Sequence, residues 1–358
     1  MTATLTGVMV AASAGAMVWV GSASAATTPG VLFRDPESQA VRWLAANPND
    51  SRAGVIRDRI ASQPNGRWFT TYQPNSVTSE VAGFVGKANA AGSVPLLVMY
   101  ALPNRDCGGA SAGGAPDIAS YKTWAQQFAK GLGSRRAIVI VEPDALALQT
   151  CLDDSKIAER DGAVAFAAKA IKDANPAAKV YLDGGHSNWN SPDEQARRLV
   201  AAGVKTSADG FYTNASNFRR TADEVAYGKA VLTQLNAPQL HFVVDTSRNG
   251  SGSLGDQWCD PAGRAIGEAP TLNTGDPAVD AFLWIKPPGE ADGCQGGAGT
   301  FSPDVAYQLA TNGSPAQSQT ATSPAPSQTA SSPAPSQTAT SLGWRSLLSL
   351  LRFLWSWR

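Results

Sequence analysis

Seven short runs of apolar and β-branched residues recur along the chain, and segments with helical spacing separate most of them. Each run is apolar over nearly its full length, as in strands whose two faces are both covered. Strands that alternate with helices form a parallel sheet, so the sequence predicts an α/β fold with about seven parallel strands. The runs are residues 67–72, 94–102, 137–143, 179–185, 209–216, 239–247 and 281–288, and the clearest helical segments are residues 76–91, 118–132, 156–173, 191–202 and 222–235.

Polar residues follow the carboxyl ends of six of these runs. In parallel α/β barrels the carboxyl ends of the strands form the active-site face. We therefore expect side chains from six different strands to converge on one cleft. The polar segments are residues 105–107, 142–144, 183–186, 214–217, 245–248 and 286–292.

The composition narrows the chemistry of this cleft. Twenty-nine basic residues balance 29 acidic residues, so no strong field favours nucleic acid as a partner. Only two histidines occur, so the chain is poorly supplied for a Ser-His-Asp hydrolase or a His-rich metal site. Paired carboxylates remain, and they suit the cleavage of glycosidic bonds, which needs a proton donor and a group that activates water. We expect no metal and no organic cofactor.

Four cysteines indicate an oxidising compartment. No C-x-x-C pair occurs among them, so disulfides are a better interpretation than a metal site. The four are Cys107, Cys151, Cys259 and Cys294. Two disulfides are expected, and spacing alone leaves three connectivities open. Residues 1–26 lack charge and end in small residues typical of a secretory cleavage site, although a basic first segment is missing. We expect a signal peptide and export, with an uncleaved membrane anchor as the alternative.

The composition also divides the rest of the chain. Residues 27–313 have a globular composition and are expected to form one catalytic domain. Residues 314–341 consist almost entirely of three copies of a nine-residue Ser/Thr/Pro/Ala/Gln unit, which predicts an extended linker. Residues 342–358 form an amphipathic tail. Two interpretations of the tail stay open, namely contact with a membrane surface or a remnant of a lost appended domain.

Several segments carry a family resemblance. VMYALPNRDC (98–107) and IVIVEPD (138–144) match both signatures of glycoside hydrolase family 6, the inverting β-1,4-glucanases that include endoglucanases and cellobiohydrolases. Five later segments resemble further blocks of that family in the same order. The likeness implies a distorted (β/α) barrel with its active site at the carboxyl ends of the strands. The five segments are DGGHSNW (183–189), NASNF (214–218), DTSRNG (245–250), QWCDP (257–261) and KPPGEADG (286–293).

The resemblance assigns three catalytic carboxylates. Asp144 would be the general acid, so its pKa must lie well above that of a free aspartate. Asp106 would raise that pKa and help to organise the attacking water, and the alternative is that Asp106 only pairs with Arg105. Asp292 matches the candidate base, which acts directly or through a chain of waters. The two carboxyl groups of an inverting pair are separated by about 6.5–9.5 Å.

The resemblance also implies a set of substrate-binding residues. Tyr100 matches a tyrosine beside the sugar ring, and Lys286 and Glu290 match residues that hydrogen-bond to glucose hydroxyls. Three tryptophans match positions where glucose rings stack, although core packing would be the interpretation of any one of them alone. Three further polar residues are expected to bind hydroxyls, orient neighbours or supply charge. The tryptophans are Trp68, Trp189 and Trp258, and the polar residues are Asp183, His186 and Asn217.

The remaining expectations concern the disulfides and the mode of attack. The family's pattern would join Cys107 to Cys151 and Cys259 to Cys294. Cellobiohydrolases of the family roof their cleft with long loops, one of them between the last two cysteines, and this segment is short here. The resemblance therefore favours a secreted, monomeric endo-β-1,4-glucanase. A cellobiohydrolase and a non-catalytic β-glucan-binding protein are the alternatives, and the natural glucan stays open.

Overall fold

The structure, a computed structural model, describes residues 30–312, and the expected signal peptide, linker and tail lie outside these residues. A seven-stranded sheet runs in the order β2-β4-β5-β6-β7-β8-β9, and every neighbouring pair is parallel. The prediction of about seven parallel strands is confirmed. The strands are β2 (Arg67–Phe69), β4 (Leu96–Met99), β5 (Ala137–Val141), β6 (Ala178–Asp183), β7 (Gly210–Thr213), β8 (His241–Asp245) and β9 (Val279–Leu283).

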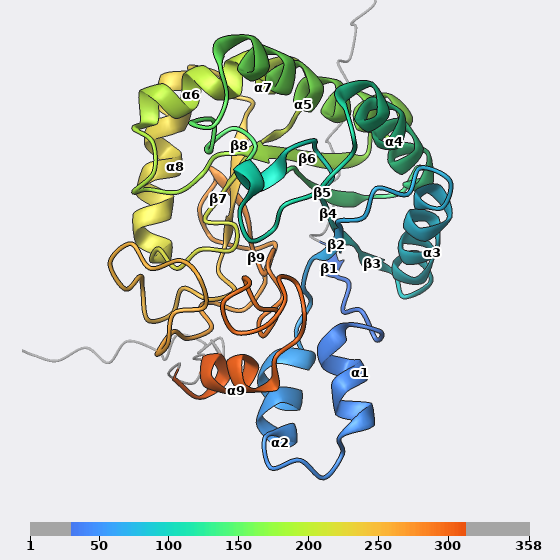
Figure 1. The fold of residues 1–358 in the computed structure, drawn as a ribbon, viewed down its shortest axis with the longest axis vertical. Helices are drawn as coiled ribbons and strands as arrows, with labels where there is room; N and C mark the ends of the chain where they lie inside the picture. The colour runs from blue at the N-terminus through green and yellow to red at the C-terminus, as the bar shows by residue number, and fades with distance from the viewer. Residues whose placement is uncertain (1–29, 313–358) are drawn as a thin grey trace, which may run out of the picture. The chain divides into compact units, whose positions relative to one another are not determined.

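Helices cover the outer side of this sheet in an arc (Figure 1). All five predicted helical segments are confirmed, with ends that differ by at most a few residues. The short helix α7 was not predicted. The helices of the arc are α3 (Val77–Ala90), α4 (Ile118–Gly131), α5 (Asp154–Ala174), α6 (Pro192–Ala201), α7 (Val204–Ser207) and α8 (Thr221–Leu235).

The core has two layers because neighbouring residues of a strand point to opposite faces of the sheet. In β5, Val139 and Val141 pack into the large apolar cluster between the sheet and the helices. Ile138 and Ile140 pack into a second cluster on the inner face of the sheet. Every residue of β5 is buried. This double burial explains why the run is apolar along its whole length.

The sheet is a distorted barrel, because its first and last strands do not pair. At this seam the N–H of Gly66 donates a hydrogen bond of 2.9 Å to the backbone oxygen of Trp284. The indole N–H of Trp68 donates a second one of 2.8 Å to the backbone oxygen of Ile285. A Cβ atom on Gly66 would lie 2.4 Å from that Ile285 oxygen, so glycine is required for the close approach.

Several elements differ from the prediction. The run 94–102 is divided at Pro95 into β3 (Ser93–Val94) and β4, and β3 pairs with β1 (Val31–Leu32) in a separate two-stranded sheet. Four helical segments near the ends of the described chain were not predicted, and they form an apolar cluster of their own. No helix within residues 30–312 is long and apolar enough to cross a membrane. The four segments are α1 (Gln39–Ala46), α2 (Ala53–Ile56), the π-helical turn η1 (Arg57–Ala61) and α9 (Pro303–Asn312).

Candidate active site

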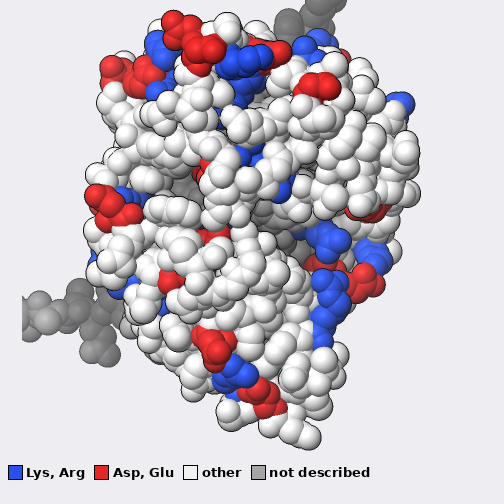
Figure 2. Space-filling view, in the orientation of Figure 1, with Lys and Arg blue, Asp and Glu red and all other residues white. Residues whose placement is uncertain are grey.

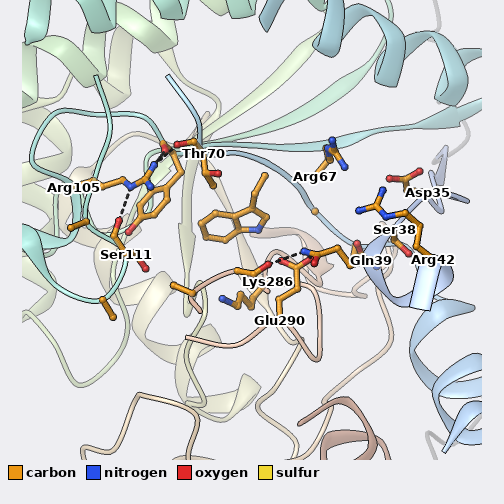
Figure 3. Close-up of a pocket in the computed structure, with 18 residues that line it drawn as sticks. Asp35, Ser38, Gln39, Arg42, Arg67, Thr70, Arg105, Ser111, Lys286 and Glu290 are labelled. Atoms are coloured by element: carbon orange, nitrogen blue, oxygen red, sulfur yellow. Dashed lines mark hydrogen bonds between the residues drawn. The ribbon is translucent and has the colours of Figure 1, made fainter. Parts of the chain in front are cut away.

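A groove made of two adjoining cavities lies where the polar strand ends converge. The catalytic cavity, of about 410 Å³, is lined by Asp106, Asp144 and Asp292. The distal cavity, of about 390 Å³, is drawn in Figure 3. The two cavities share several lining residues and therefore form one groove. The shared residues are Trp68, Tyr100, Ser111 and Lys286.

Asp144 follows β5 in a turn with an uncommon backbone. Glu142 and Asp144 have φ angles of 47° and 69°, in the left-handed region that few residues other than glycine adopt. Burial raises the pKa of Asp144 to about 8, and the negative charges of Asp183 and Asp106 act in the same direction. A hydrogen bond from Tyr100 opposes this shift. The carboxyl group therefore keeps its proton near neutral pH, as a general acid must.

Glu142 performs a different task from Asp144, although only Pro143 separates them. Its buried carboxylate accepts hydrogen bonds from the backbone N–H of Ala101, at 3.1 and 3.0 Å, and of Leu102, at 3.0 Å. Burial raises the pKa of Glu142, whereas these N–H groups lower it. Glu142 thus joins the loop after β5 to the loop after β4, while Asp144 faces the cavity.

Replacing Glu142 with glutamine is expected to lower the free energy of unfolding by about 1–3 kcal/mol. The glutamine amide has only one acceptor oxygen, and its NH₂ group would face backbone N–H groups that also donate. Urea denaturation followed by tryptophan fluorescence measures the change. Glu159→Gln, at an exposed ion pair on α5, is the matched control, with an expected change of about 1 kcal/mol or less. A Glu142→Gln protein as stable as the parent would contradict the role of this carboxylate.

Asp183 repeats this arrangement at the end of β6. It is 2 % exposed and does not line either cavity. Its carboxylate accepts hydrogen bonds from the N–H groups of Leu146 and Ala147, at 3.0 and 2.8 Å, and so holds the loop that follows Asp144. Of the roles that the sequence analysis left open for Asp183, its position fits the supply of charge better than contact with substrate. It lies beneath the loop, where its charge raises the pKa of Asp144.

Asp245 is the corresponding carboxylate at the end of β8, and the sequence analysis assigned it no separate role. It is fully buried. One oxygen accepts hydrogen bonds from the N–H groups of Ser216, at 3.0 Å, and Lys286, at 3.1 Å. Asp245 therefore joins the loops that follow β7 and β9.

Asp106 lies in a short 3₁₀ turn, η2 (Arg105–Gly108), and has a φ of 54°. Its Oδ2 accepts a hydrogen bond of 2.8 Å from the N–H of Ser111. The guanidinium of Arg105 instead donates to the backbone oxygens of Ser111, at 2.7 Å, and Thr70, at 2.6 Å. The alternative that Asp106 only pairs with Arg105 is therefore wrong, since these two described residues form no ion pair.

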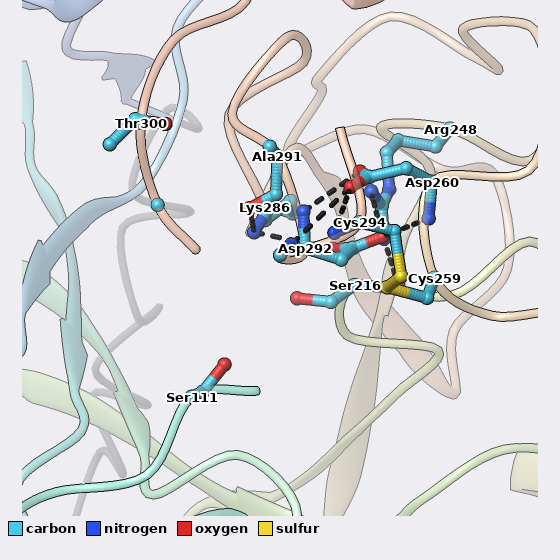
Figure 4. A network of polar contacts seen from close by, with 12 residues as sticks. Ser111, Ser216, Arg248, Cys259, Asp260, Lys286, Ala291, Asp292, Cys294 and Thr300 are labelled. Atoms are coloured by element: carbon cyan, nitrogen blue, oxygen red, sulfur yellow. Dashed lines mark hydrogen bonds and ion pairs between the residues drawn. A yellow bond between two sulfur atoms is a disulfide. The ribbon is translucent and has the colours of Figure 1, made fainter. Parts of the chain in front are cut away.

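Asp292 lies in a buried polar network (Figure 4). Its Oδ2 accepts a hydrogen bond of 2.9 Å from Nη1 of Arg248, and its Oδ1 lies 3.4 Å from Nζ of Lys286. Burial raises the pKa of Asp292, but the charges of Arg248 and Lys286 outweigh burial, so the pKa lies below its usual value. Near neutral pH Asp292 is therefore ionised while Asp144 is protonated.

Asp260 fixes the loop that carries Asp292, and the sequence analysis did not assign this role. Its carboxylate accepts hydrogen bonds from the N–H groups of Asp292, Cys294 and Gln295, at 2.8, 3.0 and 2.9 Å. In return, the N–H of Asp260 donates to Oδ2 of Asp292 at 3.1 Å. Asp260 belongs to QWCDP (257–261), one of the segments that carry the family resemblance.

Both predicted disulfides are confirmed. Cys107 is bonded to Cys151 and Cys259 to Cys294. The first bridge adjoins Asp106, and the second closes the loop of Asp292. No cluster of three or more His, Cys, Asp or Glu residues that could hold a metal ion occurs within residues 30–312.

Trp68, Tyr100 and Lys286 lie where the two cavities meet. The rings of Trp68 and Tyr100 make an edge-to-face contact with 5.3 Å between their centroids, and Nζ of Lys286 lies 5.9 Å from the centre of the Trp68 ring. Glu290 lines only the distal cavity, where Nε2 of Gln39 donates to it at 2.6 Å (Figure 3). All four predicted residues thus border the groove.

The opposite part of the catalytic cavity is lined by His186, Trp189, Asn217 and Trp258, as the sequence analysis expected. Trp189 and Trp258 are 36 % and 51 % exposed, and open indole faces of this kind suit stacking against sugar rings. Burial lowers the pKa of His186 to about 4, and the charge of Arg219 lowers it further. His186 is therefore neutral near pH 7 and packs 5.0 Å from Trp189.

Glu224 in α8 holds the loop that carries His186 and Trp189, a role the sequence analysis missed. Its Oε1 accepts a hydrogen bond of 2.9 Å from the N–H of Ser187, and burial raises its pKa to about 7. The sequence gives no signal for this contact, because a glutamate in the first turn of a helix usually faces solvent and favours the helix dipole.

The site combines one protonated carboxyl, one ionised carboxylate and exposed tryptophans in a single groove at the carboxyl ends of a parallel barrel. These are the parts of a glycoside hydrolase that uses carboxylates for proton transfer. The family model of glycosyl hydrolases family 6 matches residues 31–320. The chain belongs to this family.

Several characterised proteins resemble the chain. It is 52 % identical over 301 residues to endoglucanase A of Thermobispora bispora, covering 84 % of this chain and 66 % of that protein. It is 51 % identical over 293 residues to endoglucanase 1 of Streptomyces sp. strain KSM-9, covering 81 % of each. The chain also resembles a solved structure, that of the endoglucanase Cel6 from Mycobacterium tuberculosis in complex with methyl-cellobiosyl-4-deoxy-4-thio-β-D-cellobioside. The two superpose with a TM-score of 0.74 at 41 % identity. The match covers 79 % of this chain and 97 % of that one.

Proposed function

We propose that the protein is an endo-β-1,4-glucanase that hydrolyses internal bonds of cellulose or a related β-glucan with inversion of the anomeric centre. The observation that carries this proposal is the contrast between two carboxyl groups of one cavity, with the pKa raised to about 8 at Asp144 and lowered at Asp292. An inverting glycosidase needs one protonated and one ionised carboxyl group across the scissile bond. The thio-cello-oligosaccharide held by the Mycobacterium enzyme supports a β-glucan substrate.

In the proposed reaction Asp144 donates its proton to the leaving glycosidic oxygen while a water attacks the anomeric carbon from the other face. Asp292 accepts the proton of that water, directly or through further waters. Asp106, held by Ser111, orients the water, and its charge helps Asp144 to keep its proton. The cations that keep Asp292 ionised also make it a weak base, so proton transfer to it depends on its orientation toward the water.

The stereochemistry of the fresh product tests this mechanism. Single displacement on a β-glucan is expected to release the α-anomer first, because the attacking water enters on the face opposite the leaving group. Proton NMR of the anomeric signals during the first minutes of hydrolysis of cello-oligosaccharides measures the ratio before mutarotation. Initial release of the β-anomer would rule out inversion and leave Asp292 without its proposed role.

The mode of attack is proposed to be internal. The indoles of Trp189 and Trp258 are exposed, so the groove is accessible from solvent. The two relatives that are 52 % and 51 % identical to this chain are named endoglucanases. The alternative is a cellobiohydrolase, which releases cellobiose from chain ends. Internal attack is expected to lower the viscosity of carboxymethylcellulose long before much reducing sugar appears. Slow thinning with steady release of cellobiose would favour the alternative.

We further propose that the enzyme is secreted and acts as a monomer without a cofactor. The two disulfides support an oxidising compartment. In this arrangement residues 1–26 are the signal peptide, residues 27–313 the catalytic domain and residues 314–341 the linker. The tail, residues 342–358, keeps its two interpretations, and N-terminal sequencing of the protein from culture medium would identify the cleavage site.

A further inference from the structure

The distal cavity contains two arginines that the proposed reaction does not use. Arg42 in α1 and Arg67 in β2 line the distal cavity but not the catalytic cavity, on the side away from Arg105 and Ser111 (Figure 3). Both side chains are exposed. Arg42 donates one hydrogen bond of 2.6 Å, to the backbone oxygen of Glu37. Within residues 30–312, neither guanidinium pairs with a carboxylate, and that of Arg67 makes no hydrogen bond.

The carboxylates near these arginines are bound to other groups. Glu37 pairs with Nζ of Lys87 at 2.6 Å. Asp35 accepts the N–H of Glu37 at 2.9 Å and is buried, and Glu290 accepts from Gln39. The two guanidiniums therefore keep their capacity to bind a further anion.

One more feature adds positive charge beside the two arginines, in a cavity that Asp35 and Glu290 also line. The residues Ser38 and Gln39 at the N-terminus of α1 line the cavity, and the first turn of α1 contains no acidic residue to offset the partial positive charge of the helix end. Arg105 lines the opposite end of the cavity, where its hydrogen bonds go to backbone oxygens (Figure 3). On the face drawn in Figure 2, charged side chains of both signs lie side by side on a mostly uncharged surface.

We propose that Arg42 and Arg67 bind a carboxylate carried by a glucose unit, so that the enzyme prefers acidic β-glucans to neutral ones. The inference rests on the proposed function, because it concerns the specificity of the same groove. Guanidinium groups match the geometry of a carboxylate and form charge-assisted hydrogen bonds with it. A uronate and a carboxymethyl ether both supply this group. Neutral glucose units offer only hydroxyls, whose hydrogen bonds to a guanidinium are weaker than those of a carboxylate.

The test compares catalytic efficiency on two acidic polymers, carboxymethylcellulose and soluble C6-oxidised cellulose, with that on neutral hydroxyethylcellulose. In the Arg42→Gln/Arg67→Gln variant the acidic-to-neutral ratio of kcat/KM is expected to fall by about threefold to tenfold, mainly through KM. In about 1 M sodium chloride, where the Debye length is about 3 Å, the parent's ratio is expected to approach that of the variant.

Arg57→Gln is the matched control, because it removes one exposed positive charge from η1, outside both cavities. It is expected to keep the parent's ratio. Arg67→Gln alone removes no hydrogen bond. This single variant still tests the proposal if the double variant does not fold. A lower ratio with either acidic polymer supports the proposal and identifies the source of the carboxylate. An unchanged ratio with both, or an equal fall in Arg57→Gln, overturns it. If the parent hydrolyses none of the three polymers, the proposed function itself fails.

Discussion

Asp144→Asn is expected to lower kcat on soluble β-glucan by about 10²-fold to 10⁴-fold, the usual contribution of a positioned general acid, with a much smaller change in KM. The amide fills nearly the same space, but it cannot deliver a proton to the leaving oxygen. Initial rates of reducing-sugar release measure the loss. Asp173→Asn, at an exposed ion pair on α5, is the control and is expected to keep the parent's rate. A fully active Asp144→Asn protein would show that the acid is wrongly assigned.

The pH dependence of the parent follows from the same carboxyl group. Because the pKa of Asp144 is raised to about 8, kcat/KM is expected to fall as the pH rises through about 8 and the proton is lost. A profile that stays flat through pH 9 would contradict this role. Turnover at any pH also excludes a non-catalytic β-glucan-binding protein, which would bind the polymer without hydrolysing it.

Stability measurements give an independent check on Asp144. Because its pKa is raised by folding, the carboxyl of Asp144 keeps its proton in the folded protein at pH values where the unfolded chain, with a pKa of about 3.9, has already released it. The contribution of Asp144 to stability is therefore fully present below about pH 4 and is lost as the pH rises toward 8. Relative to the parent, Asp144→Asn is expected to gain in Tm across this window and to show no further gain above it. A constant difference in Tm would show that the pKa is not raised.

The sequence predicted the strands of the sheet well, because burial on both faces leaves an unmistakable pattern. Each residue of β5 packs either against the helices or inside the barrel, so no polar residue interrupts the run. The helical segment α1, by contrast, was missed. Its apolar and polar residues are clearly segregated on the helix, so the segment was missed although its pattern was readable.

The strand-end carboxylates show what sequence reasoning could not resolve. Position alone predicts that Glu142, Asp183 and Asp245 face the cleft together with Asp144. In the structure these three accept backbone N–H groups of neighbouring loops instead. The direction of each side chain depends on local backbone angles, such as the positive φ of Glu142, and on tertiary contacts that spacing does not encode.

The prediction that Asp292 belongs to the site is refined by its partners. Arg248 is 1 % exposed and stacks 4.4 Å from the ring centre of Phe218, so its charge has no access to bulk water. Asp292 is the carboxylate that neutralises it. The sequence placed Arg248 in a segment that resembles the family, but nothing in the segment indicated a buried ion pair.

Asp292→Ala is expected to have two large effects. It leaves Arg248 and Lys286 buried without their counterion, which costs about 3–5 kcal/mol of unfolding free energy. It also removes the proposed proton acceptor, so kcat is expected to fall by about 10²-fold or more. Denaturant unfolding and initial rates measure the two effects. Asp173→Ala breaks an exposed ion pair and is expected to cost about 1 kcal/mol or less.

Rescue by azide separates the loss of a base from the loss of a structural anion, whereas Asp292→Asn removes both. Asp292→Asn keeps the shape but not the charge, so it is expected to lose activity as Asp292→Ala does. Azide is a nucleophile that needs no deprotonation, so it is expected to restore turnover in Asp292→Ala and to form an α-glucosyl azide if Asp292 is the base. Because the pKa of Asp292 is lowered, its stabilisation is present above about pH 4 and is lost as the pH falls below that value. A stable Asp292→Ala protein that turns over at the parent's rate without azide would remove Asp292 from the mechanism and from the folding core of this site.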